Sequence, residues 1–118
     1  MLPLLKRSAA ARIVNVSSGL GSLTQMGDPN SEFGAFRFIG YGASKAALNM
    51  LTVQLAAELK DSGIKVNSAD PGYTATDLNR NRGRQTIPEG AAAVISLALL
   101  PDDGPTGGFF NANSRNPW

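Results

Sequence analysis

Short apolar strand patterns alternate with helical patterns along this chain, and this alternation narrows the folds that it can adopt. Runs rich in β-branched residues predict short buried strands, and apolar residues at three- and four-residue spacing predict helices. Strands are expected at 12–16, 64–68 and 108–111, and helices at 41–61 and 86–100, after a helix end within residues 1–11. Strands that alternate with helices pair in parallel through right-handed crossovers. The sequence therefore predicts an α/β fold, a parallel sheet with helices on both faces.

Several residues mark where the two long helices begin and end. Gly63 follows the first helical pattern and suits a left-handed cap. Thr86 and Glu89 have the spacing of a capping box, and Pro88 fits the first turn of the second helix. Residues 17–40 form a long, polar, glycine-rich connection, and loops of that length are usually functional or mobile. The apolar residues of the first helix are four leucines at three- and four-residue spacing with three alanines beside them: Leu48, Leu51, Leu55 and Leu59, and Ala46, Ala47 and Ala56.

The absence of two residue types limits the chemistry that the chain can perform. Its 118 residues, enough for one domain, include no Cys and no His. Disulfides, thiolate metal sites and a Ser-His-Asp triad are therefore excluded, no metal site is expected, and acid–base chemistry falls to Asp, Glu, Lys or Tyr. Eleven basic and nine acidic residues are too balanced for an electrostatic nucleic-acid binder.

Tyr41 and Lys45 form the strongest candidate for a catalytic pair. They lie four residues apart at the start of the first long helix, so their side chains share one face. A nearby ammonium and the positive end of a helix both favour the ionised form of a phenol. A phenol tuned in this way can donate a proton to a carbonyl oxygen or take one from an alcohol. The alternative is a chance spacing in which Tyr41 only packs.

Polar turns follow two of the predicted strands, at the edge where open α/β sheets bind ligands. Ser18 stands in a Ser-Ser-Gly turn after the first strand, where its hydroxyl can bond a substrate oxygen. Pro71 and Gly72 follow the second strand, and a glycine there lets the backbone approach a ligand closely. Thr74 and Thr76 add hydroxyl and main-chain groups. Each turn alone also fits an ordinary surface turn, but together with the Tyr–Lys pair they indicate a site.

Three strings carry a family resemblance: IVNVSS, YGASKAA and VNSADPGYTATD, in that order. Together they resemble the short-chain dehydrogenase/reductase family. The later string TDLNRNRGRQTIPEGAAAVISLALLPDDGPTGGFFN and the final Pro117-Trp118 are similar to the carbonyl-reductase-like branch of that family. The resemblance runs from about residue 2 to the end of the chain, and it implies a Rossmann-like sheet.

The resemblance also implies a role for each candidate residue. Ser18 matches the serine that orients the substrate carbonyl, and Tyr41 matches the catalytic acid/base. Lys45 matches the lysine that favours the ionised tyrosine and holds the nicotinamide ribose. The implied cofactor-binding residues are Tyr41 and Lys45 together with the turn that lines the nicotinamide and the threonines after it: Pro71, Gly72, Thr74 and Thr76. Thr74 would use its main chain to contact the carboxamide.

Two departures from the family pattern affect what the chain is expected to contain. There is no G-x-x-x-G-x-G turn, the motif with which the family binds the dinucleotide pyrophosphate at a helix N-terminus. We therefore expect residues 1–118 to be the C-terminal portion of a single domain, without its dinucleotide-binding half. The spacing from Ser18 to Tyr41 is also longer than usual in the family, as it is in the carbonyl-reductase-like branch.

Three phenylalanines in the long connection bear on the oligomeric state: Phe33, Phe36 and Phe38. In the resembling branch, an insertion at this place covers the helix that pairs in family dimers. If these rings cover the same helix here, the full-length protein is expected to be a monomer. A dimer is the alternative. An equal interpretation is that the three rings only fasten the loop.

The expected function is reduction of a ketone or aldehyde by hydride transfer from NAD(P)H, or alcohol oxidation in reverse, with Tyr41 as acid/base. The resemblance favours NADP(H) over NAD(H), with a small carbonyl or alcohol compound as substrate. The alternative is a truncated, non-catalytic relative that acts at most as a partner or folding fragment. Because the chain has no membrane-length apolar run and no signal-peptide pattern, we expect no membrane partner and a cytoplasmic location.

A third interpretation concerns the loop predicted over residues 73–85, which carries three arginines: Arg80, Arg82 and Arg84. No aromatic residue is interleaved with them, so they lack the stacking platform of single-strand binding proteins. No nucleic-acid partner is therefore expected. Within the resembling family this loop covers the substrate, so it is either a lid or a solvated loop.

Overall fold

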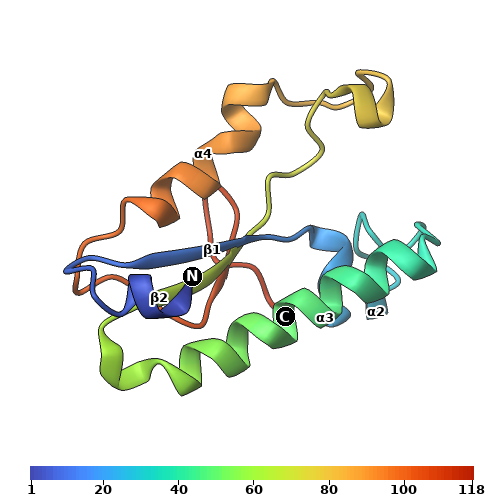
Figure 1. Ribbon diagram of the computed structural model, residues 1–118. Helices are drawn as coiled ribbons and strands as arrows, with labels where there is room; N and C mark the ends of the chain where they lie inside the picture. Colours follow the sequence, from blue (N-terminus) through green and yellow to red (C-terminus); the bar gives the residue numbers. More distant parts are fainter.

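The computed structural model describes residues 1–118 and has the α/β arrangement predicted from the sequence (Figure 1). Three parallel strands form one sheet in the order β1-β2-β3: β1 (Arg12–Val16), β2 (Lys65–Ala69) and β3 (Phe109–Phe110). The α-helices are α1 (Leu2–Leu5), α2 (Leu23–Gly27), α3 (Ile39–Glu58) and α4 (Ile87–Ala98). Short 3-10 helices lie at Gly19–Gly21, Lys60–Ser62 and Asp77–Asn79. The prediction of a Rossmann-like parallel sheet is confirmed.

The element boundaries differ from the predicted ones by a few residues. β1 has its predicted bounds, whereas β2 lies one position further along the chain and β3 is shorter. α3 begins before Tyr41, at Ile39, and α4 ends at Ala98. The connection 17–40 is not wholly irregular, because it contains a 3-10 helix and α2.

Helices cover both faces of the sheet, α1 and α3 one face and α4 the other (Figure 1). Side chains of a strand alternate between the faces. Ile13 of β1 accordingly packs with the α3 layer and Val14 with the α4 layer. The buried cluster under α3 comprises Ala11, Ala56, Leu59, Ile64 and Val66. The cluster under α4 comprises Ala69, Ala93 and Leu97.

The buried stripe of α3 is more polar than predicted. Asn49 and Thr52 are buried, whereas Leu51 is 53% exposed, and of the four predicted leucines only Leu59 is buried. Both side chains form hydrogen bonds that offset part of the cost of burial, although Oδ1 of Asn49 has no partner. The amide of Asn49 donates to a main-chain oxygen at 3.2 Å, and Oγ1 of Thr52 lies 2.8 Å from Oγ of Ser68. The leucine spacing predicted the helix correctly; Ala56 and Leu59 are buried and Leu55 packs against the core, whereas Leu51 is exposed.

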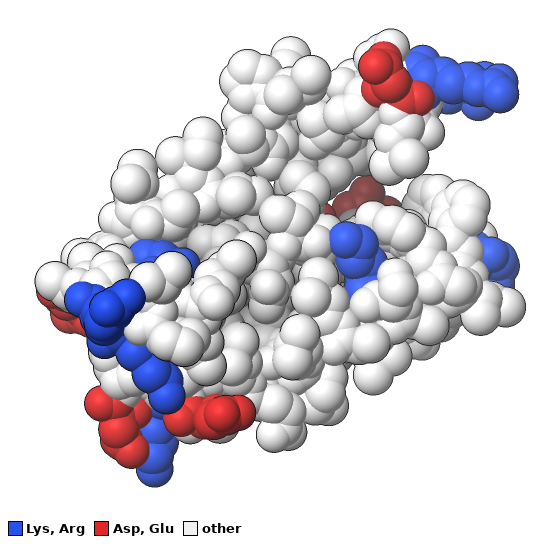
Figure 2. All heavy atoms as spheres, in the orientation of Figure 1, with Lys and Arg blue, Asp and Glu red and all other residues white.

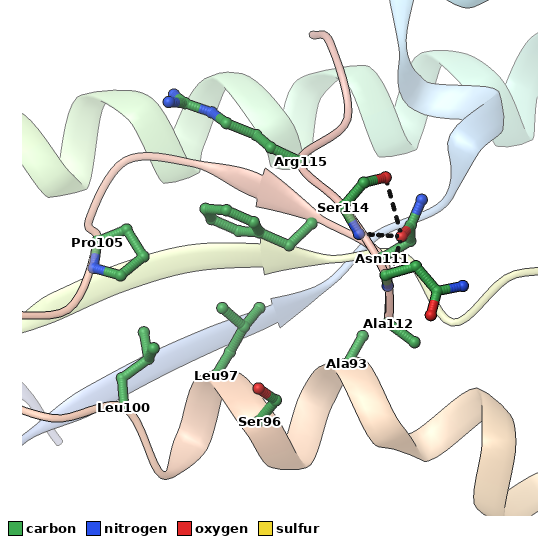
Figure 3. A pocket seen from close by; sticks show the side chains of 11 residues that line it. Ala93, Ser96, Leu97, Leu100, Pro105, Asn111, Ala112, Ser114 and Arg115 are labelled. Carbon is green, nitrogen blue, oxygen red and sulfur yellow. Dashed lines mark hydrogen bonds between the residues drawn. The ribbon is translucent and has the colours of Figure 1, made fainter.

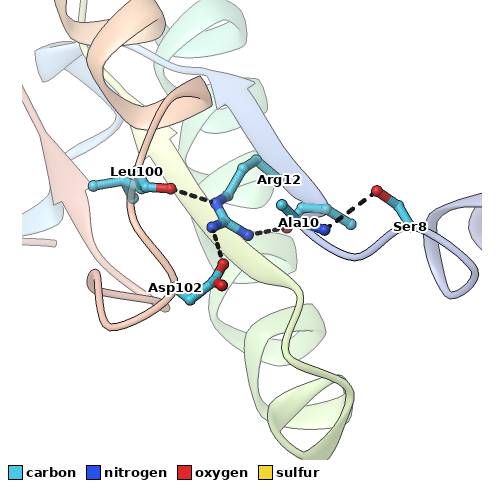
Figure 4. A network of polar contacts seen from close by, with 6 residues as sticks. Ser8, Ala10, Arg12, Leu100 and Asp102 are labelled. Atoms are coloured by element: carbon cyan, nitrogen blue, oxygen red, sulfur yellow. Dashed lines mark hydrogen bonds and ion pairs between the residues drawn. The ribbon is translucent and has the colours of Figure 1, made fainter.

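Arg12 fastens β1 to the segment that follows α4 (Figure 4). Its Nε donates to the carbonyl of Leu100 at 2.9 Å, and Nη2 lies 2.7 Å from Oδ1 of Asp102. The Arg12 side chain is 7% exposed, but that of Asp102 is 82% exposed. An ion pair with so exposed a carboxylate contributes little to stability. The hydrogen bond to the Leu100 carbonyl is therefore the main polar link between β1 and this segment.

The predicted capping box is confirmed, whereas Gly63 caps the 3-10 helix Lys60–Ser62, because α3 itself ends earlier, at Glu58. Gly63 has a φ of 74°, in the left-handed region. Thr86 and Glu89 form the predicted capping box: Oε2 of Glu89 accepts from the Thr86 N–H at 2.7 Å and from its Oγ1 at 2.8 Å. The main-chain bond first, and the hydroxyl bond second, lower the pKa of the Glu89 carboxyl from its ordinary value of 4.5. Slight desolvation opposes the shift.

The lowered pKa of Glu89 makes the stability of the fold depend on pH. Because the folded-state pKa lies below the unfolded-state one, the stabilisation is present above 4.5 and is lost as the pH falls through the folded-state value. We expect the Tm difference between wild type and Glu89→Gln to be largest at neutral pH and to shrink on acidification below 4.5. Thermal melts followed by circular dichroism measure it, and a difference that does not change with pH would contradict the prediction.

Candidate active site

The turns that follow β1 and β2 lie together at the carboxyl edge of the sheet. The two strands are parallel, and Val16 pairs with Ala69 at their ends. Ser18 follows the first strand, and Pro71 follows the second. The start of α3 packs against the 3-10 helix Gly19–Gly21, which belongs to the first turn. The structure therefore brings the two predicted turns and the predicted Tyr–Lys helix to one edge.

Ser18 stands where the strand turns into the 3-10 helix. Its backbone is extended, with φ −164° and ψ 149°, and its Oγ accepts from the Leu20 N–H at 3.3 Å. The side chain is half-buried. Because the hydroxyl oxygen serves as the acceptor in this bond, its O–H can still donate to another oxygen.

Gly21 sets how closely this turn approaches α3. A Cβ at Gly21 would lie 2.8 Å from both the main-chain carbon and the Cβ of Lys45. Carbon atoms make ordinary contacts at about 3.5–4.0 Å, so any larger residue would force the two segments apart. The glycine thus fixes the separation between the Ser18 turn and the helix that carries Tyr41 and Lys45.

Gly21→Ala is expected to destabilise the fold by about 1–3 kcal/mol, the usual cost of overpacking. The matched control is Gly27→Ala, because a Cβ there meets nothing within 4 Å. Denaturant unfolding followed by circular dichroism compares the two variants. Equal stability of both variants would show that the contact between Gly21 and α3 has no energetic weight.

Tyr41 and Lys45 lie side by side in the first turns of α3. The Lys45 Nζ is 5.6 Å from the centroid of the Tyr41 ring, and Tyr41 is 44% exposed. Nζ also donates to the Val16 carbonyl at 2.8 Å. Successive residues of a strand direct their main-chain groups to opposite sides. The Ser17 N–H faces β2, where it donates to the Ala69 carbonyl, so the Val16 carbonyl faces the open side of β1. The ammonium thus joins the end of β1 to the helix that carries the phenol.

The turn after β2 depends on Gly72, whose φ is 68°. A Cβ there would also overlap the side-chain amide of Gln85. The Thr74 N–H donates to the Gly72 carbonyl at 3.0 Å, and the Thr74 carbonyl accepts from Asn79 at 2.7 Å. Both main-chain groups of Thr74 are therefore already bonded within the loop. Thr76 is held in the same way, through its N–H to Oδ1 of Asn79 at 3.1 Å.

Asp70 belongs to this edge and was missed by the sequence interpretation. It is 8% exposed, and its Oδ1 accepts from the Gly72 N–H at 3.0 Å. Its Oδ2 accepts from the Asn116 amide at 3.1 Å. A Cβ at Gly19 would lie 3.2 Å from that same oxygen. The one available signal was an acidic residue placed directly between a buried strand and a Pro-Gly turn.

The loop after β2 projects from the body of the molecule, and Figure 2 shows a hollow beneath it at the upper right. Arg80 and Asn81 adopt left-handed backbone conformations at its tip, with φ of 55° and 57°. Leu78 is 92% exposed there. The only ion pair of the chain joins Arg12 to Asp102, so the loop arginines pair with no carboxylate. The loop therefore presents an apolar side chain and unpaired cations.

The three phenylalanines of the long connection do not form one group. Phe33 lies over the Ser18 turn, since a Cβ at Gly19 would be 2.7 Å from its ring. Phe36 and Phe38 stack on each other at 6.0 Å and are 44% and 58% exposed. Met50 on α3 stays 59% exposed. The expectation of a single cover over α3 is therefore not met, and the monomeric state of a longer form stays a prediction.

A cavity of about 340 Å³ lies between α4 and the segment after β3 (Figure 3). None of the predicted site residues lines it. Its apolar wall includes Ala93, Leu97 and Phe110, and its polar rim includes Asn111, Ser114 and Arg115. No helix of the chain has the length and hydropathy needed to cross a membrane, and no three acidic side chains gather to hold a metal ion.

Fold and site together define a Rossmann-like α/β chain with a hydroxyl, a phenol and an ammonium at the carboxyl edge of its sheet. The pattern of the short chain dehydrogenase family matches residues 1–87. The chain belongs to the short-chain dehydrogenase/reductase family, a family of oxidoreductases, and is similar to its carbonyl reductases.

Several characterised proteins resemble the chain over nearly its whole length. (+)-Neomenthol dehydrogenase of Capsicum annuum is 34% identical, over 92% of this chain and 45% of that protein. Salutaridine reductase of Papaver bracteatum is also 34% identical, over 96% of this chain and 46% of that protein. The NADPH-bound carbonyl reductase from chicken fatty liver superimposes with a TM-score of 0.80 at 28% identity, over 99% of this chain and 49% of that one. The chain thus spans about half the length of these relatives.

Proposed function

We propose that the native polypeptide, meaning the natural chain that carries residues 1–118, reduces a ketone or aldehyde with NADP(H) and oxidises the alcohol in reverse. The observation that carries this proposal is the placement of the Tyr41 phenol beside the Lys45 ammonium at the edge that also holds Ser18. A family of oxidoreductases and an NADPH-bound structural relative support it. The substrate is a small carbonyl compound, in keeping with the names of the relatives.

The residues present suit the nicotinamide part of such a cofactor. Gly72 has a positive φ that favours glycine, so this turn at the edge of the sheet carries no side chain. Lys45 uses one N–H for the Val16 carbonyl, which leaves further donors for ribose hydroxyls. Thr74 would have to exchange its present main-chain bonds to contact the carboxamide. The bound cofactor would supply the hydride that the carbonyl carbon receives.

The protein side chains manage the proton and the developing charge. The Ser18 hydroxyl donates a hydrogen bond to the substrate carbonyl oxygen and so orients it. The Tyr41 hydroxyl donates its proton to the same oxygen, and the Lys45 ammonium stabilises the phenolate that remains. Since Tyr41 is 44% exposed, the phenolate can regain a proton from solvent. In the reverse direction the phenolate accepts the proton of the alcohol.

The proposal is tested by mixing the native polypeptide with NADPH and a panel of ketones and aldehydes. The absorbance of the reduced nicotinamide should fall with the same stoichiometry as alcohol formation measured by chromatography. Absence of turnover across the panel with both NADPH and NADH would overturn the proposal. It would favour the alternative of a non-catalytic relative.

Residues 1–118 alone are expected to bind NADPH weakly or not at all. The chain offers no glycine-rich turn for the pyrophosphate, and that turn is a major source of dinucleotide affinity. Isothermal titration calorimetry of the purified 118-residue chain measures the affinity. A Kd in the low micromolar range would contradict this prediction and show that the nicotinamide side alone suffices.

A further inference from the structure

Three segments that are far apart in the sequence meet at the carboxylate of Asp70. They are the Ser18–Gly19 turn, the Pro71–Gly72 turn and the C-terminal tail, defined here as residues 111–118. The Gly72 N–H and the Asn116 amide donate hydrogen bonds to the carboxylate, and Gly19 lies beside it, since a Cβ there would be 3.2 Å from Oδ2. Each of the three strands thus leads into one of the segments that adjoin Asp70.

The hydrogen bonds of the tail have a fixed direction. Oδ1 of Asn111 accepts from the N–H of Asn113 at 2.8 Å and from the N–H and hydroxyl of Ser114 at 2.8 and 3.2 Å (Figure 3). Its amide nitrogen must therefore face Asn116, where it donates to Oδ1 at 2.7 Å. The amide nitrogen of Asn116 in turn faces Asp70. With the hydrogen bonds running in this direction, the atom of residue 70 that faces Asn116 must be an acceptor.

The carboxylate of Asp70 meets that requirement with both oxygens. One accepts from Gly72 and the other from Asn116, so an amide side chain in its place could satisfy only one of them. Asp70 and Asn116 are 8% and 7% exposed. A buried carboxylate is costly unless hydrogen-bonded, and no cation pairs with this one. Its hydrogen bonds to the two segments therefore keep it in place.

Main-chain bonds dock the tail at the same point. The Asn116 N–H donates to the Phe109 carbonyl at 2.8 Å, and directly before the tail the Asp70 N–H donates to the Phe110 carbonyl of β3 at 2.7 Å. Beyond Asn116, the ring of Trp118 stacks on Phe109 at 5.6 Å. Undocking of the tail would therefore move Trp118 away from a fully buried ring.

We propose that Asp70 is a positioning residue that holds the Ser18 turn and the Gly72 turn in register through the docked C-terminal tail. The catalytic consequence rests on the proposed function, in which Ser18 binds the substrate oxygen and Gly72 lines the nicotinamide. Asp70 itself contacts neither substrate nor cofactor. Its loss is expected to misplace both turns at once, and so to raise KM for the cofactor and lower kcat.

An exchange of the two side chains provides the sharpest test. Asp70→Asn places an amide nitrogen against the Asn116 amide nitrogen, and Asn116→Asp places two carboxylates together. The double variant Asp70→Asn/Asn116→Asp is expected to restore every bond. The amide at position 70 accepts from the Gly72 N–H through its oxygen and donates through its nitrogen to the carboxylate at position 116. That carboxylate still accepts from the Asn111 amide. Asp103→Asn is the matched control, because Asp103 is exposed and makes no hydrogen bond.

The first readout does not depend on catalysis. Trp118 is the only tryptophan of the chain, so its fluorescence without cofactor reports docking of the tail. We expect both single variants to shift the emission to the red, as the indole gains solvent, and the double variant and the control to match wild type. A double variant that stays shifted, or single variants that match wild type, would overturn the proposal.

The second readout is steady-state kinetics of the native polypeptide. The single variants should lose about 10- to 100-fold in kcat/KM, as expected for a broken hydrogen bond to a buried charge, and the double variant should recover it to within about 3-fold. Changed fluorescence with unchanged kinetics would overturn the positioning role. If wild type shows no turnover at all, the proposed function fails, and the fluorescence series still decides whether Asp70 holds the tail.

Discussion

Replacing Tyr41 by phenylalanine is expected to abolish carbonyl reduction by the native polypeptide while leaving cofactor affinity within a few-fold of wild type. The substitution removes only the hydroxyl, so the ring that lies 5.6 Å from the Lys45 ammonium stays in place. General acid–base groups contribute roughly 10²- to 10⁴-fold to rate, so kcat should fall by at least that range. Steady-state kinetics measures the loss, and an NADPH titration measures the affinity.

Tyr73→Phe is the matched control for this experiment. Tyr73 is the other tyrosine of the chain, is 53% exposed and makes no side-chain hydrogen bond. Its variant should keep most of the turnover. If Tyr41→Phe retained turnover comparable to that of the control, Tyr41 would not be the proton donor, and another group would have to protonate the product.

Phe109→Ala is expected to destabilise the protein by about 3–5 kcal/mol, the range measured for truncation of buried phenylalanines. The Phe109 ring is fully buried in β3 and stacks on Trp118 at 5.6 Å. Small domains are stabilised by only about 5–15 kcal/mol in total, so such a loss takes a large part of the margin. Denaturant unfolding, followed by circular dichroism and by Trp118 fluorescence, should show an early transition with both probes.

Phe38→Ala serves as the control for Phe109, because its side chain is 58% exposed. Exposed substitutions usually change stability by about 0.5 kcal/mol or less. A small cost for Phe109→Ala, comparable to that of the control, would mean that β3 and the tail contribute little to folding of the chain.

The fold was predictable because its signals are local. The β-branched run of β1 and the capping box of Thr86 and Glu89 act within a few residues, and both were read correctly from the sequence. The burial of Thr52 on α3 was not predictable, because it depends on a partner, Ser68, that β2 supplies. Hydropathy ranks Leu51 above Thr52, whereas the structure buries the residue whose hydroxyl finds a bond.

In the site, too, local contacts were predictable from the sequence and contacts between distant segments were not. The proximity of Tyr41 and Lys45 follows from helical spacing, so the sequence alone predicted it. The contact between Asp70 and Asn116 joins residues on separate segments, and no periodicity reveals it. The engaged main chain of Thr74 was equally hidden, because its partner Asn79 lies in an irregular loop.

The strand register has a consequence for how the chain folds. Arg12 pairs with Lys65, and Ser68 pairs with Phe109, so no strand meets its neighbour through a hairpin. Each strand pairing must first close a long loop of chain. The conformational entropy of that loop is lost before any sheet hydrogen bond compensates for it. Proteins dominated by such distant contacts fold far more slowly than helical bundles. The nascent chain should therefore remain open to aggregation and to chaperones until α3 has delivered β2 to β1.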